Sequence, residues 1–387
     1  MKYILSCLLG IFVLSSCKVQ KVNVKSQFEF VEKQTDYMLQ QIQQTDVKPN
    51  QVSPRTVENG KLKMVGSGDW TSGFFPGELW FLYDYTKEQK WKTEAEKFTA
   101  KIEKEKFNIG THDLGFMIYC SFGNGFKATN NEAYKQVIIQ AAKSLCTRFN
   151  PKTGVIKSWD HNKTKWTNPV IIDNMMNLEL LFEATKLTGD SSFYKIAVSH
   201  ANTTMQNHFR PDYSSYHVVD YNPQTGEVIK KTTAQGYADE SAWARGQAWG
   251  LYGYIVCYRY TNDSKYLAQA KHIASFILNN PTLPKDKIPY WDYNDPAIPN
   301  APRDASAAAI TSSALFELAT YTKDKSYKKI ANEILFNLSN AYRSPLKENE
   351  GFLLIHSTGH KPANSEIDVP INYADYYYLE ALLRSRK

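Results

Sequence analysis

Two aspartates lie within apolar segments of the chain, a setting suited to proton-transfer chemistry. Asp113 lies in the segment THDLGF (111–116), and Asp173 lies in the segment IIDNMMN (171–177). Apolar neighbours remove water from a carboxylate, which raises its pKa and makes its charge costly unless it is paired or used. Two such carboxylates on separate elements indicate an acid/base pair, with Asp113 and Asp173 as the candidate catalytic residues.

Other kinds of chemistry leave no signal in the sequence. No Cys/His spacing indicates zinc, no glycine-rich phosphate loop follows a strand, and no Ser-His-Asp or Cys-His order stands out. We therefore expect no metal and no organic cofactor. The net charge of +7 is spread along the chain without a basic block, which argues against nucleic acid as a partner and suits an anionic small ligand. Aromatic residues make up 13%, which fits either sugar-binding platforms or a helical core.

Residues 1–17 predict a lipoprotein signal peptide that is not part of the fold. An apolar run over residues 3–14, too short to span a membrane, ends in LSSC, which resembles the lipobox of bacterial lipoproteins. Cys17 would then be the lipidated first residue of the mature chain. The alternative is an ordinary signal peptide that is cleaved elsewhere.

The mature chain, residues 18–387, is expected to be held at the outer membrane by its lipid alone. No later segment is long and apolar enough to cross a bilayer. Residues 18–21 lack the acidic run often linked to surface export, which favours the periplasmic face over the cell surface. Three cysteines remain in the mature chain and cannot all pair, so we expect buried thiols at Cys120, Cys146 and Cys257.

A repeated pattern indicates the architecture. An apolar helical segment is followed by Thr-x-Asp or Thr-x-Glu, then by Tyr or Trp and Ala, in copies that begin at Thr86, Thr188, Thr261 and Thr322, with a looser copy at Thr129. We interpret each copy as a helix end, a tight turn and the capping residue of the next helix.

Each copy is preceded by a helix that opens from a polar loop, near Trp70, Asp113, Asp173, Ala242, Ala305 and Tyr373. Six openings, each followed by a returning helix, predict six helical hairpins. Spacings of roughly 40 to 70 residues are too irregular for a stacked solenoid. We therefore predict an all-α fold, a single (α/α)6 barrel over residues 18–387, with an open helical array as the alternative.

Seven motifs, in this order, resemble the unsaturated glucuronyl hydrolases of bacteria that degrade acidic polysaccharides. The resemblance runs from about Trp70 to Leu382. The motifs lie at 70–77, 112–116, 173–178, 210–212 with His217, 235–237, 243–249 and 302–307. The resemblance implies an (α/α)6 barrel and an enzyme that acts on the Δ4,5-unsaturated uronic acid left by polysaccharide lyases. It also implies that water adds across the vinyl ether and that the resulting hemiketal opens to release the remaining sugar.

The resemblance assigns a role to each aspartate. Asp173 corresponds to the general acid that protonates C4 and then to the base that activates water for attack at C5. Asp113 corresponds to the second carboxylate, which stays ionised, stabilises developing positive charge and helps to keep Asp173 protonated. Without the resemblance, either aspartate alone could simply cap a helix.

The resemblance also indicates the substrate-binding residues: Trp70, His112, Trp159, His217, Thr233, Gln235, Arg245 and Trp249. Taken singly, the tryptophans could equally be core residues and the histidines ordinary loop residues. Family members that accept sulfated substrates use a serine and a lysine in a region like the loop containing Ser357 and Lys361. In this chain His360 interrupts that pattern, so the sequence leaves open whether Ser357 and Lys361 bind sulfate.

Two other functions remain open at this stage. An unsaturated rhamnogalacturonyl hydrolase would use the same hydration chemistry on pectin fragments, and a glycan-binding lipoprotein would bind oligosaccharide without reaction. The expected partner is an oligosaccharide with an unsaturated uronate, of glycosaminoglycan or ulvan type. The sequence does not indicate the oligomeric state.

Overall fold

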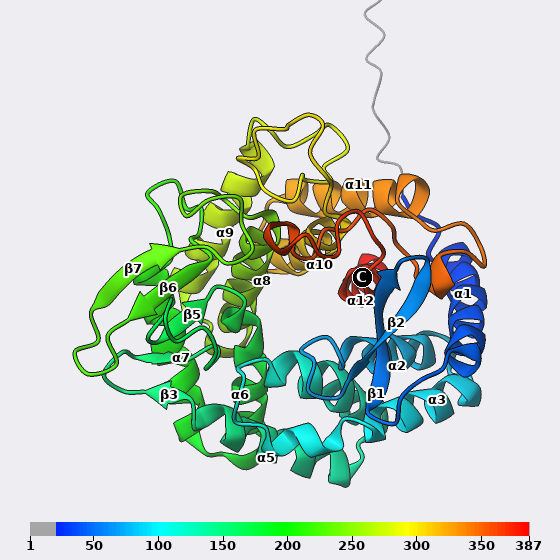
Figure 1. Cartoon of the computed structure of the whole chain (residues 1–387), viewed down its shortest axis with the longest axis horizontal. Coiled ribbons are helices and arrows are strands. Elements are labelled where there is room, and N and C mark those ends of the chain that lie inside the picture. The colour runs from blue at the N-terminus through cyan, green and yellow to red at the C-terminus, as the bar shows by residue number, and fades with distance from the viewer. Residues whose placement is uncertain (1–20, 387) are drawn as a thin grey trace, which may run out of the picture.

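In the computed structural model, helices form a ring in which inner and outer members alternate (Figure 1). The structure describes residues 21–386, so the predicted signal peptide and Cys17 lie outside it. The inner helices are α2 (Phe74–Thr86), the π-helix η2 (Gly115–Gly123) continued by α4 (Asn124–Thr129), α6 (Asn174–Thr188), α8 (Ala244–Thr261), α10 (Ala305–Tyr321) and α12 (Asn372–Ser385). The outer helices are α1 (Val24–Gln44), α3 (Gln89–Ala100), α5 (Glu132–Cys146), α7 (Ser191–Asn207), α9 (Ser264–Asn279) and α11 (Lys325–Ala341).

Burial separates the two sets of helices. Every residue of α8 from Ala244 to Cys257 is buried, and α10 is buried from Ala305 to Phe316. The outer helix α11 buries one stripe only, which includes Ala331, Leu335 and Leu338. A helix that is apolar on all sides belongs inside, whereas a one-sided helix covers it. The helices are therefore divided into an inner and an outer set, as the predicted barrel requires.

The sixth helix pair differs from the prediction. Five pairs are formed by consecutive helices, but no helix follows α12 in the described chain, and α1 occupies the outer position beside it. The Tyr378 hydroxyl of α12 donates to Gln27 Oε1 of α1 over 3.0 Å. The ring is thus closed by elements from the two ends of the chain. The repeat could not predict α1, because α1 precedes the first copy.

The threonines of the repeat end the inner helices. The Thr188 hydroxyl donates to the Ala184 carbonyl over 2.7 Å and accepts the N–H of Asp190 over 3.1 Å. Its bonds satisfy a carbonyl left free at the helix end and fix the turn into the next helix. The same two bonds are made by Thr86, Thr129 and Thr261.

The acidic residues of the repeat cap the outer helices, with one exception. Asp190, Asp263 and Asp324 each accept a backbone N–H in the first turn of α7, α9 and α11. Glu88 stands at the same position before α3, but its side chain makes no capping bond in the described structure. The longer glutamate side chain does not reproduce the short aspartate cap.

Small sheets interrupt the connections, which the all-α prediction did not include. Their strands are β1 (Gln51–Glu58), β2 (Lys61–Gly66), β3 (Phe149–Asn150), β4 (Val155–Ile156), β5 (Pro169–Ile171), β6 (Val218–Tyr221) and β7 (Val228–Thr232). The sheet β5–β6–β7 is antiparallel throughout. Strand β5 ends just before Asp173 and β6 begins just after His217, so this sheet positions two candidate site residues.

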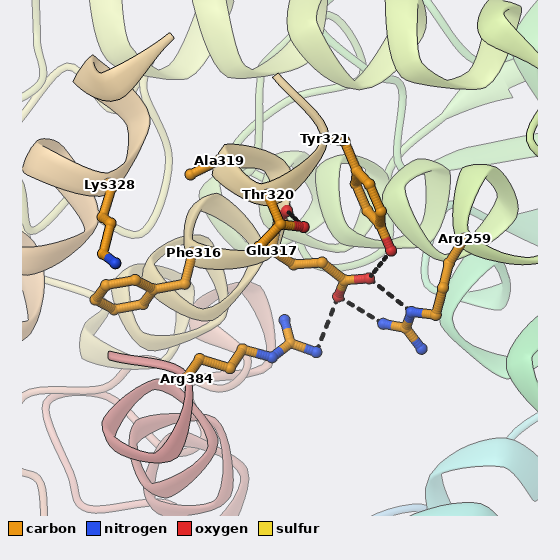
Figure 2. A pocket seen from close by; sticks show the side chains of 8 residues that line it. All are labelled: Arg259, Phe316, Glu317, Ala319, Thr320, Tyr321, Lys328 and Arg384. Atoms are coloured by element: carbon orange, nitrogen blue, oxygen red, sulfur yellow. Dashed lines mark hydrogen bonds and ion pairs between the residues drawn. The ribbon is translucent and has the colours of Figure 1, made fainter. Parts of the chain in front are cut away.

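The C-terminal ends of the inner helices carry a separate cavity of about 470 Å³ (Figure 2). Arg259 of α8 and Arg384 of α12 both bind the carboxylate of Glu317 on α10, over 2.6 and 2.9 Å. Although burial alone would raise the pKa of Glu317, Arg384 and Arg259 lower it to about 2. This network ties three inner helices together. We call this end of the barrel the closed end and the opposite end the mouth.

Two further properties concern residues 21–386. The three cysteines in this range are free thiols, as predicted. Cys120 and Cys257 are buried as expected, whereas Cys146 is only partly buried. None of the helices in this range combines the length and apolar character needed to span a membrane.

Candidate active site

A cavity of about 590 Å³ opens at the mouth, where the inner helices begin. Both aspartates line it. Of the eight predicted binding residues, five line it as well: Trp70, His112, Trp159, His217 and Gln235. Thr233, Arg245 and Trp249 do not. The sequence analysis missed other residues of the wall, among them Arg55, His161, Lys165, Trp166, Glu366 and Tyr373.

Asp113 is held by its immediate neighbours. The Thr111 hydroxyl donates to Asp113 Oδ2 over 2.6 Å, and His112 Nε2 lies 3.2 Å from Asp113 Oδ1. Asp113 lies two residues before the widened turns of η2, where the N–H of Phe116 donates to Asn177 Oδ1 on α6 over 3.0 Å. This bond links the helix that follows Asp113 to the helix that follows Asp173.

Glycine is required at position 115 by that same link. A Cβ atom on Gly115 would lie 2.6 Å from the backbone Cα of Asn177, closer than a Cβ atom can approach another heavy atom. The glycine of the THDLGF motif therefore allows η2 and α6 to touch behind the two aspartates. This contact keeps the first turns of η2 and α6 close together.

Asp173 sits at the start of α6 but does not cap it. Its side chain makes no capping hydrogen bond in the described structure, and its Oδ2 has no hydrogen-bond partner among residues 21–386. The residue is only 6% exposed. Burial raises the pKa of Asp173 to about 7; Arg245 opposes the shift and the Asp113 carboxylate adds to it. A carboxyl that is half protonated at neutral pH can both give and take a proton.

A neutral histidine, His217, lies beside Asp173. His217 Nδ1 accepts the N–H groups of Ala234 and Gln235 over 3.1 and 3.0 Å, so Nδ1 carries no proton. Burial lowers the pKa of His217 well below its usual value, which keeps the ring neutral. The single proton is therefore on Nε2, which lies 3.7 Å from Asp173 Oδ2. His217 thus presents a hydrogen-bond donor beside the reactive carboxyl.

A raised pKa alone does not mark the site. Burial also raises the pKa of Asp375 to about 8, yet Asp375 does not line the cavity, and its carboxylate accepts the N–H groups of Leu353 and Leu354. What distinguishes Asp173 is the combination of a raised pKa, an unpartnered oxygen and a place in the cavity wall.

Two aromatic groups frame the cavity. Trp70 packs against Tyr373, with ring centroids 4.9 Å apart. Trp159 stacks on His161 at 5.3 Å and meets Trp166 edge-on. Trp70 and Trp159 are partly exposed and line the cavity, so they offer faces to a sugar ring.

The three predicted binding residues outside the cavity wall support it from behind. Arg245 is 1% exposed and donates to Asp304 Oδ2 over 2.9 Å and to the carbonyls of Thr358 and Gly359. The Thr233 hydroxyl accepts the N–H of Gly236. Trp249 is fully buried between Phe116 and Tyr377.

The loop with Ser357, His360 and Lys361 docks over the cavity. His360 lines the cavity and contacts the Ala234 carbonyl through Nε2 over 3.0 Å. Lys361 instead bonds to Asp295 over 3.0 Å, and Ser357 is fully buried; neither lines the cavity. The serine and the lysine therefore do not form a pocket at this wall. Among residues 21–386, no three His, Cys, Asp or Glu side chains cluster as metal ligands.

Residues 32–255 match the family model described as Glycosyl Hydrolase Family 88. The chain belongs to this family. It is 55% identical over 324 residues to an unsaturated glucuronyl hydrolase of Formosa agariphila, covering 83% of this chain and 81% of that protein. It is 34% identical over 346 residues to an unsaturated chondroitin disaccharide hydrolase of Streptococcus pneumoniae, covering 87% of this chain and 86% of that protein.

Solved structures of family 88 members share the whole fold. An unsaturated glucuronyl hydrolase specific for heparin superimposes with a TM-score of 0.88 at 46% identity, covering 92% of this chain and 96% of that chain. The enzyme from Bacillus sp. GL1 gives 0.87 at 30% identity, covering 93% and 96%. The chain is thus an unsaturated glucuronyl hydrolase with an (α/α)6 barrel, as its motifs imply.

Proposed function

We propose that the enzyme removes the Δ4,5-unsaturated glucuronic acid from the non-reducing end of glycosaminoglycan fragments made by polysaccharide lyases. The observation that carries the proposal is the pairing of Asp113 with a buried Asp173 in one cavity. The related enzymes support the substrate class: one is described as specific for heparin, and a Streptococcus agalactiae enzyme was crystallised with dGlcA-GalNAc6S.

The proposed reaction follows from the protonation state of the site. The protonated Asp173 carboxyl delivers its proton to C4 of the double bond, and positive charge develops at C5 and the ring oxygen. The Asp113 carboxylate stabilises that charge, and the Nε2–H of His217 lies 3.7 Å from the Asp173 carboxyl. The Asp173 carboxylate then takes a proton from the water that attacks C5. The hemiketal formed at C5 opens and releases the remaining sugar.

A panel of lyase products tests this function. The ultraviolet absorbance of the conjugated unsaturated uronate is expected to disappear when the enzyme acts on disaccharides from heparin, chondroitin or hyaluronan. Loss of absorbance with rhamnogalacturonan fragments alone would replace the proposal by the pectin-directed activity, and loss with ulvan fragments alone would move the substrate class to algal polysaccharide. Binding without any loss of absorbance would identify a glycan-binding protein instead.

We also propose that Cys17 carries a lipid and that the closed end of the barrel faces the membrane, on the periplasmic side. Helix α1 begins at Val24, and its Phe28 stacks on Tyr85 near the end of α2, with ring centroids 3.7 Å apart. The chain between Cys17 and Val24 spans at most about 25 Å. An anchor at Cys17 would therefore hold the closed end near the bilayer and leave the mouth open to substrate.

Fluorescent labels at two exposed positions test this orientation. With Lys87→Cys at the closed end and Lys163→Cys at the mouth, a lipid-attached quencher is expected to quench the first label more strongly than the second. Equal or reversed quenching would contradict the orientation. Release of the Cys17→Ser variant into the soluble fraction would support the anchor, and digestion by protease added to intact cells would place the enzyme on the cell surface.

A further inference from the structure

One buried serine contacts the segments that carry both aspartates. Ser158 is fully buried, in the connection between β4 and β5, and belongs to the cavity wall. Its carbonyl accepts the N–H of His112 over 3.1 Å, and its own N–H donates to the Pro169 carbonyl over 2.9 Å. Its hydroxyl accepts the N–H of Ile171 over 3.0 Å. Ser158 is therefore hydrogen-bonded on one side to His112, the neighbour of Asp113, and on the other side to the strand that leads into Asp173.

The hydroxyl of Ser158, together with the Asp113 carboxylate, favours one tautomer of His112. Since this oxygen accepts the Ile171 N–H, its own proton is free to be donated to His112 Nδ1, which lies 3.4 Å away. Burial lowers the pKa of His112, so the ring is neutral and holds one proton. With Nδ1 acting as acceptor, that proton is on Nε2 and points to Asp113 Oδ1, 3.2 Å away.

We propose that Ser158 is a positioning residue for both reactive carboxylates, Asp113 and Asp173. Through His112 it orients Asp113, and through Ile171 it fixes the end of β5 from which Asp173 follows. This inference rests on the roles proposed above for the two aspartates. Ser158 has no part in proton transfer to the substrate; its hydroxyl acts through its two hydrogen bonds.

Loss of the hydroxyl should therefore affect turnover more than binding. In Ser158→Ala, Ile171 N–H loses its acceptor and His112 can place its proton on either nitrogen. We expect kcat to fall roughly 10- to 100-fold, because small displacements of reacting groups cost that much, with KM little changed. Ser158→Thr keeps a hydroxyl on the same carbon and is expected to recover most of kcat.

A matched control separates this effect from a general loss of stability. Ser312 is equally buried, and its hydroxyl donates to the Ala331 carbonyl over 3.0 Å, outside the cavity. Ser312→Ala removes the same atom and is expected to lower the melting temperature to a similar extent while leaving kcat unchanged. If kcat falls in both alanine variants in proportion to the decrease in melting temperature, Ser158 has only a structural role and the proposal is overturned.

The tautomer of His112 gives a direct readout. Long-range proton–nitrogen NMR spectra of histidine-labelled enzyme are expected to show His112 protonated at Nε2 in the wild type and in Ser158→Thr, but as a mixture of tautomers in Ser158→Ala. An unchanged tautomer or an unchanged kcat in Ser158→Ala would contradict the proposal. If Asp113→Asn and Asp173→Asn are themselves active, the proposed roles of the aspartates fail first, whatever Ser158 does.

Discussion

Replacing Asp173 by asparagine is expected to abolish turnover without unfolding the barrel. Asparagine has the same shape but can neither give a proton to C4 nor take one from water. Because general acid–base catalysis contributes about 100- to 10,000-fold to a rate, and Asp173 serves in both steps, we expect a loss at the upper end of this range. The absorbance assay with unsaturated disaccharides measures it.

The same replacement should not lower stability. The pKa of Asp173 is raised because burial makes its charge costly, and Arg245 and Asp113 only modify that shift. Neutral asparagine removes this cost, so we expect a melting temperature equal to or above that of the wild type at neutral pH. Asp220 is a matched control: it is 1% exposed, and its carboxylate accepts the N–H groups of Thr167 and Asn168. Asp220→Asn is expected to lose stability and keep turnover.

The pH dependence follows from the same carboxyl. Since Asp173 must be protonated to begin the reaction and its pKa is about 7, kcat/KM is expected to be high below pH 7 and to fall as pH rises through about 7. The free energy of unfolding changes in the same direction. The stability that neutral Asp173 contributes is fully present below the pKa of about 4 that this carboxyl has in the unfolded chain. That stability is lost as pH rises through about 7. A rate that stays constant as pH rises through about 7 would contradict the role of Asp173.

The sequence predicts the cavity wall well where a residue stands just before the first turn of α2, η2 or α6. Trp70, His112, Asp113 and Asp173 all meet this condition, and all line the cavity. The repeat places these helix starts at the same end of a ring, so their side chains converge by the geometry of the barrel. His217 and Gln235 were identified through the family motifs instead, since they lie on loops.

Residues whose position depends on tertiary pairing could not be predicted in this way. Arg55 lies on β1, outside the helical repeat, and reaches the cavity because Asp69 and Glu366 hold its guanidinium. Nothing in the sequence links position 55 to position 366. Arg245 and Trp249 also lie in the first two turns of an inner helix, α8, but neither lines the cavity, because each residue turns by about 100° along a helix. Their side chains face neighbouring helices and loops behind the wall.

Arg245 is therefore expected to act on the reaction through charge and through the loop above the cavity. Its guanidinium binds Asp304, which is fully buried, and the carbonyls of Thr358 and Gly359. In Arg245→Met, the Asp304 carboxylate is left buried without its cation, and we expect the free energy of unfolding to fall by about 3–5 kcal/mol. Urea unfolding measures this loss. Arg259→Met should also be destabilising, because it removes one cation from Glu317 at the closed end.

The pH profile distinguishes the two arginines. The positive charge of Arg245 opposes the effect of burial on Asp173, so its removal is expected to raise the Asp173 pKa further and move the fall in kcat/KM to higher pH. Arg245→Lys keeps the charge and should leave the midpoint of the fall in kcat/KM near that of the wild type. A lysine cannot replace the several N–H donors of the guanidinium, so the loop that contains Gly359 loses hydrogen bonds and KM is expected to rise. Arg259→Met should leave the midpoint unchanged. A midpoint that moves to lower pH in Arg245→Met, or moves equally in Arg259→Met, would mean that deprotonation of Asp173 does not cause the fall of kcat/KM at high pH.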